Sequence, residues 1–599
     1  PGARRAPWAA VASVGIYAVL GLVAYRPSWP GGGGRIVGCP CGDGSESAWF
    51  LAWTPHAVLH GLDPFFTTAV NHPVGVNLAA NATMPLLGLL ALPVTLTAGP
   101  AASLSLLLWA AYPLSAGAMY LVLRRWTAWA PAAFAGGLLY GFSPYMVGQG
   151  RLHLNLVFVP LPPLVMLALY ELVVRRRGGA LRWGGLLGAL VAAQYLVSTE
   201  ILATTVVVAL LGLVVLAAAR PREVLPALRH AAPGAGLAAG IAAVVVAYPT
   251  WELLAGPRRY HLPLAFVDQV SLRGDLLGAV VPTRSAWLSP GWLAHLGGAA
   301  AGSAGVVENG TYLGVPLLLL AGYLAVRFRR DRWLPYLLAM AACTYVLSLG
   351  PHLTVGGHRT GVPLPFALVE RVPLLELATP VRLSLYTAMF VAVLVALGLD
   401  HLRRAVAAPS RTRPGRAELV VVGVVAVAAL LALVPRWPAA TSPSGVPPYF
   451  TAAGVDRVPP GATVLAYPYP VPGRSQAMLW QAAAGMRFAM LGSYALHPVA
   501  GGLASQYPTQ LRPADVQPAL YALEGAGPPP SPPVPRPRLV ADLRELLADQ
   551  HVAAVLVGRR SPGAGAAASL VASALGEPPA RKGGVDAWYG VQDRLARTR

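Results

Sequence analysis

Charged residues are scarce in this chain. Only 12% of its 599 residues are charged and 55% are hydrophobic, and the mean hydropathy is +0.56. A water-soluble domain normally carries charge on about a quarter of its residues, which cover its surface. This shortage argues against a soluble enzyme and indicates a protein that lies in a membrane.

Cysteine is nearly missing too. Three cysteines in a chain of this length exclude a disulfide scaffold, an iron–sulfur protein and a multi-zinc protein. Only the pair Cys39 and Cys41, separated by one proline, remains to be considered. These residues are either two thiols, free or cross-linked, or part of a zinc site completed by Asp43 and His56.

Lysine occurs once, as Lys582, so nearly all of the 45 basic residues are arginines. The chain also lacks a glycine-rich loop suited to cradling phosphate, because the run 31–34 is followed neither by lysine nor by a predicted helix. Nucleotide-driven transport is therefore improbable, and the case for a nucleotide-sugar donor is weak.

Long apolar runs fill the first 435 residues. A helix needs about 20 mostly apolar residues to cross a bilayer, and about eleven segments meet this need. They lie near 8–25, 100–123, 130–147, 154–174, 183–199, 201–219, 232–252, 311–326, 333–350, 383–402 and 417–435. The apolar stretch 84–98 is interrupted by prolines, so we expect it to be re-entrant or interfacial.

Arginine clusters occur at every second loop between these spans. The six clusters contain Arg4 and Arg5, Arg124 and Arg125, Arg175 to Arg177, Arg220 and Arg222, Arg327, Arg329 and Arg330, and Arg403, Arg404, Arg411 and Arg413. Arginines near helix ends are retained on the cytoplasmic side. The clusters therefore place 26–99, 253–310, 351–382 and everything after 436 on the outer face, and the basic excess reflects topology and not nucleic-acid binding.

The composition changes after residue 436, where a segment rich in proline and serine is followed by scattered charges. Residues 462–467 and 552–557 are predicted to be buried strands and 540–548 an amphipathic helix. We expect a polytopic α-helical membrane protein with two domains. Residues 1–435 would form the transmembrane domain with outer loops 26–99 and 253–310, and 436–599 a small soluble extracytoplasmic α/β domain.

The first outer loop contains the most informative motif. Ser45 and the residues after it predict a helix start. The aromatic residues of that helix suit the membrane interface: Trp49, Phe50 and Trp53. Such a helix would hold Asp43 and Glu46 just outside the lipid headgroups, where a carboxylate can take a proton from an acceptor hydroxyl. Alternatively, Asp43 only caps the helix and Glu46 supports it, as in a capping box.

With these residues in this layout, the chain resembles the GT-C superfamily of integral-membrane glycosyltransferases, in particular its large actinobacterial-type members. The resemblance covers the many spans, the long first outer loop with an early acidic residue, the interfacial helices and the soluble C-terminal domain. The stretch Gly-Leu-Asp-Pro-Phe at 61–65 is similar to a Gly-x-Asn-Pro-Phe segment of such loops.

The resemblance implies a polyprenyl-phosphate-linked sugar as donor and a loop carboxylate that acts as catalytic base or binds a metal. Asp43 matches that loop acid, and Glu46 is the next candidate. The chain has no adjacent acidic pair and no Asp-x-Asp in this loop. The need for a divalent cation such as Mg or Mn therefore stays open.

A lipid phosphate next to hydrocarbon needs a cationic partner. Arg382 enters a span from the outer side and is the first candidate for binding the donor phosphate. Arg151 and His153, at another outer helix end, come second, and Arg258 with Arg259 is a weaker choice. The alternative for each is a side chain that snorkels to the interface.

Four further residues are candidates for binding the acceptor or for supporting the site: Glu200, Asp275, Glu308 and His56. Glu200 lies between the fifth and sixth spans, where it would hold an acceptor, orient an arginine or simply form a turn. Asp275 and Glu308 belong to a loop that resembles the second interfacial segment of the superfamily. Asp275 alternatively caps a helix.

These predictions lead to an inverting membrane glycosyltransferase with Asp43 as base. It would move a hexose or pentose from a polyprenyl-phosphate donor to an extracytoplasmic glycan, lipid or protein. A flippase for lipid-linked saccharides is the first alternative, but it would carry charges near the bilayer midplane, whereas the polar candidates here lie at outer helix ends. A non-catalytic membrane scaffold is the second alternative.

Overall fold

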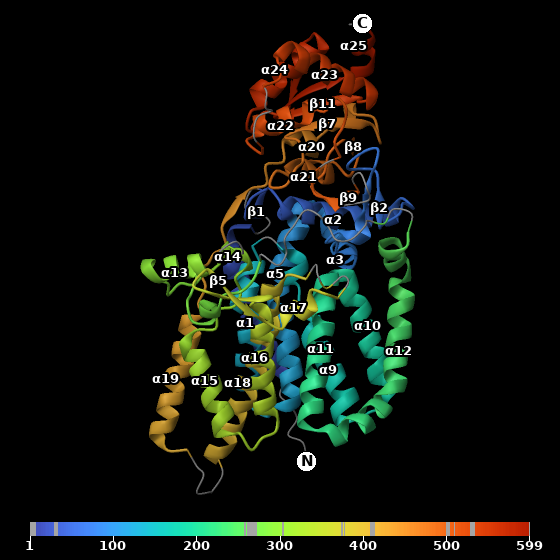
Figure 1. Cartoon of the computed structure of the whole chain (residues 1–599). Helices are drawn as coiled ribbons and strands as arrows, with labels where there is room; N and C mark the ends of the chain where they lie inside the picture. Colours follow the sequence, from blue (N-terminus) through green and yellow to red (C-terminus); the bar gives the residue numbers. More distant parts are fainter. Residues whose placement is uncertain are drawn as a thin grey trace. The chain divides into compact units, whose positions relative to one another are not determined.

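The computed structural model describes residues 7–28, 34–151, 153–256, 259, 272–301, 305–372, 375, 378–407, 414–498, 504–507, 509–527 and 533–597. The chain divides into two compact units (Figure 1). The first comprises Pro1–Arg26, Leu107–Val246 and Asp268–Ala439, and the second comprises Pro27–Leu106, Ala247–Val267 and Ala440–Arg599. Some arginines of the sequence analysis lie outside the described residues, namely Arg4, Arg5, Arg258, Arg411 and Arg413.

The first unit is a bundle of apolar helices. Its longer helices are α1 (Pro7–Tyr25), α6 (Ala130–Gly141), α9 (Leu161–Leu169), α10 (Ala180–Val197), α11 (Thr199–Ala219), α13 (Gly291–Ala301), α15 (Val315–Arg327), α16 (Trp333–Ser348), α18 (Ser384–Ala407) and α19 (Arg416–Ala432). Its short elements are α7 (Pro144–Gln149), α8 (Leu154–Val157), η3 (Tyr170–Arg175), η5 (Leu276–Ala279), α14 (Gly305–Glu308), β4 (His352–Val355), β5 (His358–Pro363), α17 (Phe366–Val369) and η8 (Pro380–Leu383). Two helices contribute residues to both units, α5 (Pro100–Trp126) and α12 (Pro221–Leu254).

Among the described residues, seven helical segments are long and apolar enough to cross a membrane. They are Trp8–Tyr25, Pro100–Trp126, Leu154–Arg175, Ala180–Val197, Thr199–Ala219, Pro221–Leu254 and Pro380–Ala407. The predicted polytopic helical membrane fold is confirmed. The other four predicted spans coincide with the shorter helices α6, α15, α16 and α19, of 12 to 17 residues, so the count of eleven stays a prediction.

The segment 130–147 is not one continuous helix, because the helix stops after Gly141 and a new one starts at Pro144. The Ser143 hydroxyl accepts a hydrogen bond from the Met146 amide at 3.4 Å, and Pro144 takes the first helical position. Serine before a helix and proline at its first position are both typical start signals. They end one helix here and begin the next.

The second unit combines the first outer loop with the C-terminal part of the chain. The loop elements are β1 (Arg35–Val37), α2 (Asp43–Leu59), β2 (Phe66–Thr67), β3 (Val76–Asn77), η2 (Leu78–Ala80), α3 (Pro85–Leu90) and α4 (Leu92–Ala98). The helices of the C-terminal part are α20 (Pro448–Thr451), η9 (Val455–Arg457), α21 (Gln476–Ala483), α22 (Val516–Glu524), α23 (Arg536–Asp549), α24 (Ala564–Leu575) and α25 (Val591–Arg597). The segment expected to be re-entrant or interfacial forms α3 and α4, of six and seven residues.

A five-stranded mixed sheet forms the core of the C-terminal part, and Figure 1 labels its strands β7, β8 and β11. The strand order is β12-β13-β11-β7-β8. Its strands are β7 (Thr463–Tyr467), β8 (Ala489–Met490), β11 (Ala554–Gly558), β12 (Ala580–Lys582) and β13 (Val585–Tyr589). Strand β7 runs parallel to β8 and β11, while β13 is antiparallel to β11. All residues of β7 and β11 are buried, as the apolar runs at 462–467 and 552–557 predict, and the helix predicted at 540–548 lies within α23.

The first outer loop and the C-terminal part are hydrogen-bonded to each other. Strand β1 pairs antiparallel with β6 (Thr441–Pro443), and the Trp49 indole donates to Gln481 of α21 at 2.6 Å. The aromatic side chains of α2 are buried, with exposures of 0%, 2% and 4% for Trp49, Phe50 and Trp53. Protein, and not lipid, therefore covers these three side chains, and the position of α2 at the membrane interface stays a prediction.

Small residues allow α10 and α12 to pack closely. A methyl group at Gly184 would lie 2.6 Å from the carbonyl carbon of Gly234, and one at Gly188 would lie 2.8 Å from the carbonyl oxygen of Ala238. Gly185, one residue along the same helix, would place a methyl group no closer than 3.8 Å from its nearest neighbour, Leu237. Close backbone approach at small residues is a common way for membrane helices to associate.

We therefore predict that Gly184→Ala lowers the free energy of unfolding by about 1–3 kcal/mol, because the added methyl group must push two backbones apart. Gly185→Ala is the matched control and should leave stability unchanged or slightly higher, since alanine favours the helix. Thermal unfolding of the purified proteins in detergent measures both. Equal midpoints for the two variants would contradict the close packing of α10 on α12.

Candidate functional site

Arg382 lies at the centre of a polar cluster in the first unit. It belongs to η8, directly before α18. Its Nε and Nη2 donate to the two carboxylate oxygens of Glu308 at 3.0 and 2.6 Å, and its Nη1 donates to Glu200 at 2.6 Å. The exposed fractions of the Arg382, Glu308 and Glu200 side chains are 14%, 8% and 21%. A guanidinium held by a two-pronged contact and a second carboxylate has one fixed orientation.

Gln149, the last residue of α7, and His153, the residue directly before α8, extend this cluster. Gln149 donates to Glu308 at 2.7 Å, and its side-chain oxygen lies 2.5 Å from Nδ1 of His153. The same His153 nitrogen lies 3.6 Å from Glu308. The structure thus joins four residues selected from the sequence, namely Arg382, His153, Glu200 and Glu308. Gln149 was missed, although its spacing of four residues from His153 places both on one side of a helical turn.

The cluster is rich in negative charge. Burial on its own raises the pKa of Glu308, but the Arg382 guanidinium, followed by His153 and Gln149, brings that pKa down to about 2. Glu308 is therefore ionised at neutral pH. Two carboxylates face one guanidinium, so the three side chains together carry a formal charge of −1 when Glu200 is also ionised. Each of Nε, Nη1 and Nη2 of Arg382 donates to a carboxylate.

The other candidates of the first unit do not join the described contacts of this cluster. Arg151 is half-buried two residues before His153, and its side chain makes no described hydrogen bond to Glu200 or Glu308. Asp275 is fully buried and caps η5, where it accepts from Leu277 at 2.8 Å. Its carboxylate also accepts from the amides of the turn between β4 and β5. The capping alternative for Asp275 is confirmed.

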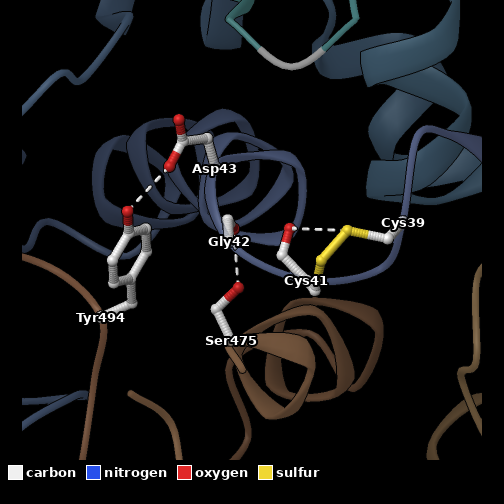
Figure 2. The surroundings of a disulfide bond; sticks show 6 residues. All are labelled: Cys39, Cys41, Gly42, Asp43, Ser475 and Tyr494. Carbon is white, nitrogen blue, oxygen red and sulfur yellow. Dashed lines mark hydrogen bonds between the residues drawn. A yellow bond between two sulfur atoms is a disulfide. The ribbon is translucent and has the colours of Figure 1, made fainter. Parts of the chain in front are cut away.

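Asp43 occupies the first position of α2 in the second unit. The residue before it, Gly42, takes the N-cap position with φ of 53° and provides no side-chain cap. The Asp43 carboxylate instead accepts a hydrogen bond from the Tyr494 hydroxyl at 2.9 Å (Figure 2). The alternative in which Asp43 caps the helix and forms a capping box with Glu46 is wrong, because the N-cap is a glycine.

Glu46 lies one turn further along α2, on the same side of the helix as Asp43. Burial, and then the negative charge of Asp43, raise the pKa of Glu46 well above its ordinary value. Burial and the neighbouring carboxylate therefore both favour the protonated form of Glu46.

The zinc alternative for the two cysteines is wrong. Cys39 and Cys41 form a disulfide next to Gly42 (Figure 2), which leaves no thiolate to bind a metal. Asp43 and His56 lie thirteen residues apart on α2, which is about 20 Å at 1.5 Å per residue. Within the described part of the chain, no group of three or more His, Cys, Asp and Glu residues is arranged to hold a metal ion.

His56 lies at the other end of α2, far from Asp43 along the helix. Its ring stacks on that of His60, with centroids 4.2 Å apart. Burial and then His60 lower the pKa of His56, so its ring is neutral at pH 7. The described contacts place His56 in an aromatic stack with Trp53 and not beside either carboxylate of the first turn.

Comparisons with known proteins address the fold. A family model described as "Domain of unknown function (DUF6311)" matches residues 50–376, more than half of the chain. No curated protein matches this chain. Among solved structures, the arabinofuranosyltransferase AftD from mycobacteria aligns with 98% of this chain at 15% identity and a TM-score of 0.54. A second structure, of a variant of that enzyme, also aligns with 98% of this chain, at 15% identity and a TM-score of 0.56.

This chain spans about 40% of the length of the AftD structures, since it covers 40% of one and 42% of the other. ArnT from Cupriavidus metallidurans, without ligand, also aligns, with 98% of this chain and 99% of that chain covered, 12% identity and a TM-score of 0.48. The resemblance to the GT-C superfamily is confirmed at the level of the fold.

We predict that Arg382→Met lowers the free energy of unfolding by about 3–5 kcal/mol, because two carboxylates lose their shared cation. A triple variant that also carries Glu200→Gln and Glu308→Gln should recover most of this loss. Arg151→Met is the control, since its side chain lies outside the cluster's described contacts. Denaturant unfolding in detergent, followed by tryptophan fluorescence, measures all three. A triple variant no more stable than Arg382→Met would contradict the ion-pair account.

Proposed function

The chain belongs to the DUF6311 family and has the fold of the GT-C membrane glycosyltransferases, and from this we infer that it is itself a membrane glycosyltransferase. We propose that it moves a pentose or hexose from a polyprenyl-phosphate-linked donor to a hydroxyl of an extracytoplasmic glycan, lipid or protein. The observation that carries the proposal is the fold shared with an arabinofuranosyltransferase over 98% of the chain.

The topology of the polar groups supports a reaction on the outer face. Glu200 and Arg382 lie at the first turns of α11 and of the segment that leads into α18. The opposite ends of these helices carry Arg220 and Arg404, which the positive-inside rule assigns to the cytoplasm. In this proposal residues 1–435 form the transmembrane domain and 436–599 an extracytoplasmic α/β domain that binds the acceptor.

The first unit supplies the donor-binding role. We assign Arg382 to the donor phosphate, with His153 and Arg151 as second candidates for binding it. Glu200 and Glu308 orient the guanidinium before the donor arrives, so little reorganisation is needed when the phosphate binds. Because these carboxylates already hold three guanidinium nitrogens, the phosphate would share the cation with them rather than replace them.

The second unit supplies the acceptor-activating role. Asp43 takes the proton of the acceptor hydroxyl as that oxygen attacks the anomeric carbon, and the bond to the lipid phosphate breaks with inversion. A phosphate is a good leaving group, so no strong acid is required on that side. Glu46 is the second candidate for the base, and the proposal assigns no step to a divalent cation.

The rival function is a flippase for the same lipid-linked saccharide. Reconstituted proteoliposomes given a radiolabelled polyprenyl-phosphate sugar separate the possibilities. Label that moves to a new acceptor supports the enzyme, and label that only crosses the bilayer supports the flippase. Retention of all label on the donor, in its original leaflet, supports a scaffold.

We predict that Asp43→Asn reduces sugar transfer by at least about 100-fold, the lower end of the range for loss of a general base. Asp63→Asn is a matched control, because Asp63 lies in the same loop and also accepts a hydrogen bond from a tyrosine, Tyr248 at 2.6 Å. Transfer by the control should stay near the parent level. Parent-like transfer by Asp43→Asn would remove Asp43 from the mechanism and leave Glu46 as the candidate base.

A further inference from the structure

Tyr494 belongs to the C-terminal part of the chain, 451 residues after the carboxylate to which it donates. The segment that carries it follows β8 and is fixed at several points. The Leu491 amide donates to Val464 of β7 at 3.4 Å, and the Tyr494 amide donates to the Met478 sulfur at 3.4 Å. Asn81 of the first outer loop holds both backbone groups of Leu496, at 2.7 and 3.0 Å.

The backbone next to Asp43 is fixed from the same side. The Ser475 hydroxyl, directly before α21, donates to the Gly42 carbonyl at 2.6 Å (Figure 2). Gly42 has φ of 53°, a conformation that favours glycine. The chain before it is closed by the disulfide between Cys39 and Cys41. These contacts fix the backbone at the start of α2 independently of the Asp43 side chain.

The hydrogen bond from Tyr494 limits the rotation of the Asp43 carboxylate. Figure 2 shows one carboxylate oxygen directed at the tyrosine hydroxyl and the other pointing away from it. Burial, followed by the charges of Asp43 and Glu46, raises the pKa of Tyr494. The phenol therefore keeps its proton and remains a hydrogen-bond donor to the carboxylate.

We propose that Tyr494 is a positioning residue, which fixes the orientation of the Asp43 carboxylate toward the acceptor hydroxyl. This inference rests on the proposed function. It assigns to the C-terminal part a role in catalysis itself, in addition to binding an acceptor. A base that is misplaced by about 1 Å can lose about 100-fold in rate, so such a contact has kinetic consequences.

The test is Tyr494→Phe in the full-length protein reconstituted with a polyprenyl-phosphate sugar. We expect kcat to fall about 10- to 100-fold while KM for the donor stays unchanged, because the ring keeps its packing and only the hydroxyl is lost. The acidic limb of the pH–rate profile should move to higher pH, since the hydrogen bond favours the charged carboxylate. Glu46 is the other titratable group on this helix turn. The variant Glu46→Gln therefore shows which limb of the pH–rate profile reports the titration of Glu46.

Tyr248→Phe is the matched control. It removes a tyrosine hydroxyl that donates to Asp63 in the same unit, so it should cost a similar amount of stability and leave kcat and the pH profile unchanged. Parent-like kcat and pH profile for Tyr494→Phe, combined with an inactive Asp43→Asn, would overturn the positioning role and leave the proposed function intact. An active Asp43→Asn would instead count against the proposed base.

A measurement without substrate keeps the inference testable if no transfer is found. Carbodiimide modifies protonated carboxyl groups, so the pH dependence of labelling at Asp43, followed by mass spectrometry, reports its protonation. Tyr494→Phe should shift the labelling midpoint of Asp43 to higher pH, and Tyr248→Phe should not. An unchanged midpoint in Tyr494→Phe would overturn the inference whatever the enzyme's activity.

Discussion

A largely buried guanidinium between two carboxylates is the interaction on which the polar cluster of the first unit depends. Near hydrocarbon, an isolated charge is costly, and a charged group is retained there only with a partner. Arg382 satisfies Glu200 at the start of α11 and Glu308 at the end of α14. It therefore joins helices that are far apart in sequence, and it can do so only in one geometry.

The same cluster orients the Arg382 guanidinium. A free arginine would adopt many rotamers, whereas this one is held by hydrogen bonds at Nε, Nη1 and Nη2. The two carboxylates also limit its attraction for anions, because their combined charge exceeds that of the guanidinium. The likeness to a known glycosyltransferase concerns the fold, and a fold alone does not establish a chemical reaction.

The second unit follows a different principle, in which segments remote in sequence build one structure. The first outer loop contributes a strand and several helices that pack on the C-terminal part through Trp49, Gln481 and Asn81. The surroundings of Asp43 are consequently provided by residues near 475 and 494. A catalytic carboxylate in this loop would be controlled by the end of the chain.

Several predictions from the sequence failed for identifiable reasons. Apolar aromatic residues on a helix predict burial, but they do not say whether lipid or protein covers them, and for Trp49 the cover is α21. The capping alternative for Asp43 failed because an acidic residue near the start of a predicted helix can occupy either the N-cap or the first helical position. Asp43 occupies the first helical position. In 130–147 the hydropathy is continuous, so the Ser-Pro pair at 143 and 144 was the only sign of a break.

The sequence by itself determined the membrane class, the positions of the apolar helices, the main strands of the sheet and the choice of Arg382, Glu200, Glu308 and His153. These follow from local composition and from the cost of charge in lipid, which act on each segment separately. Only the tertiary structure decided that these four side chains meet, and that Tyr494 donates to Asp43. Contacts between residues hundreds of positions apart depend on how the whole chain packs, and no local pattern records that.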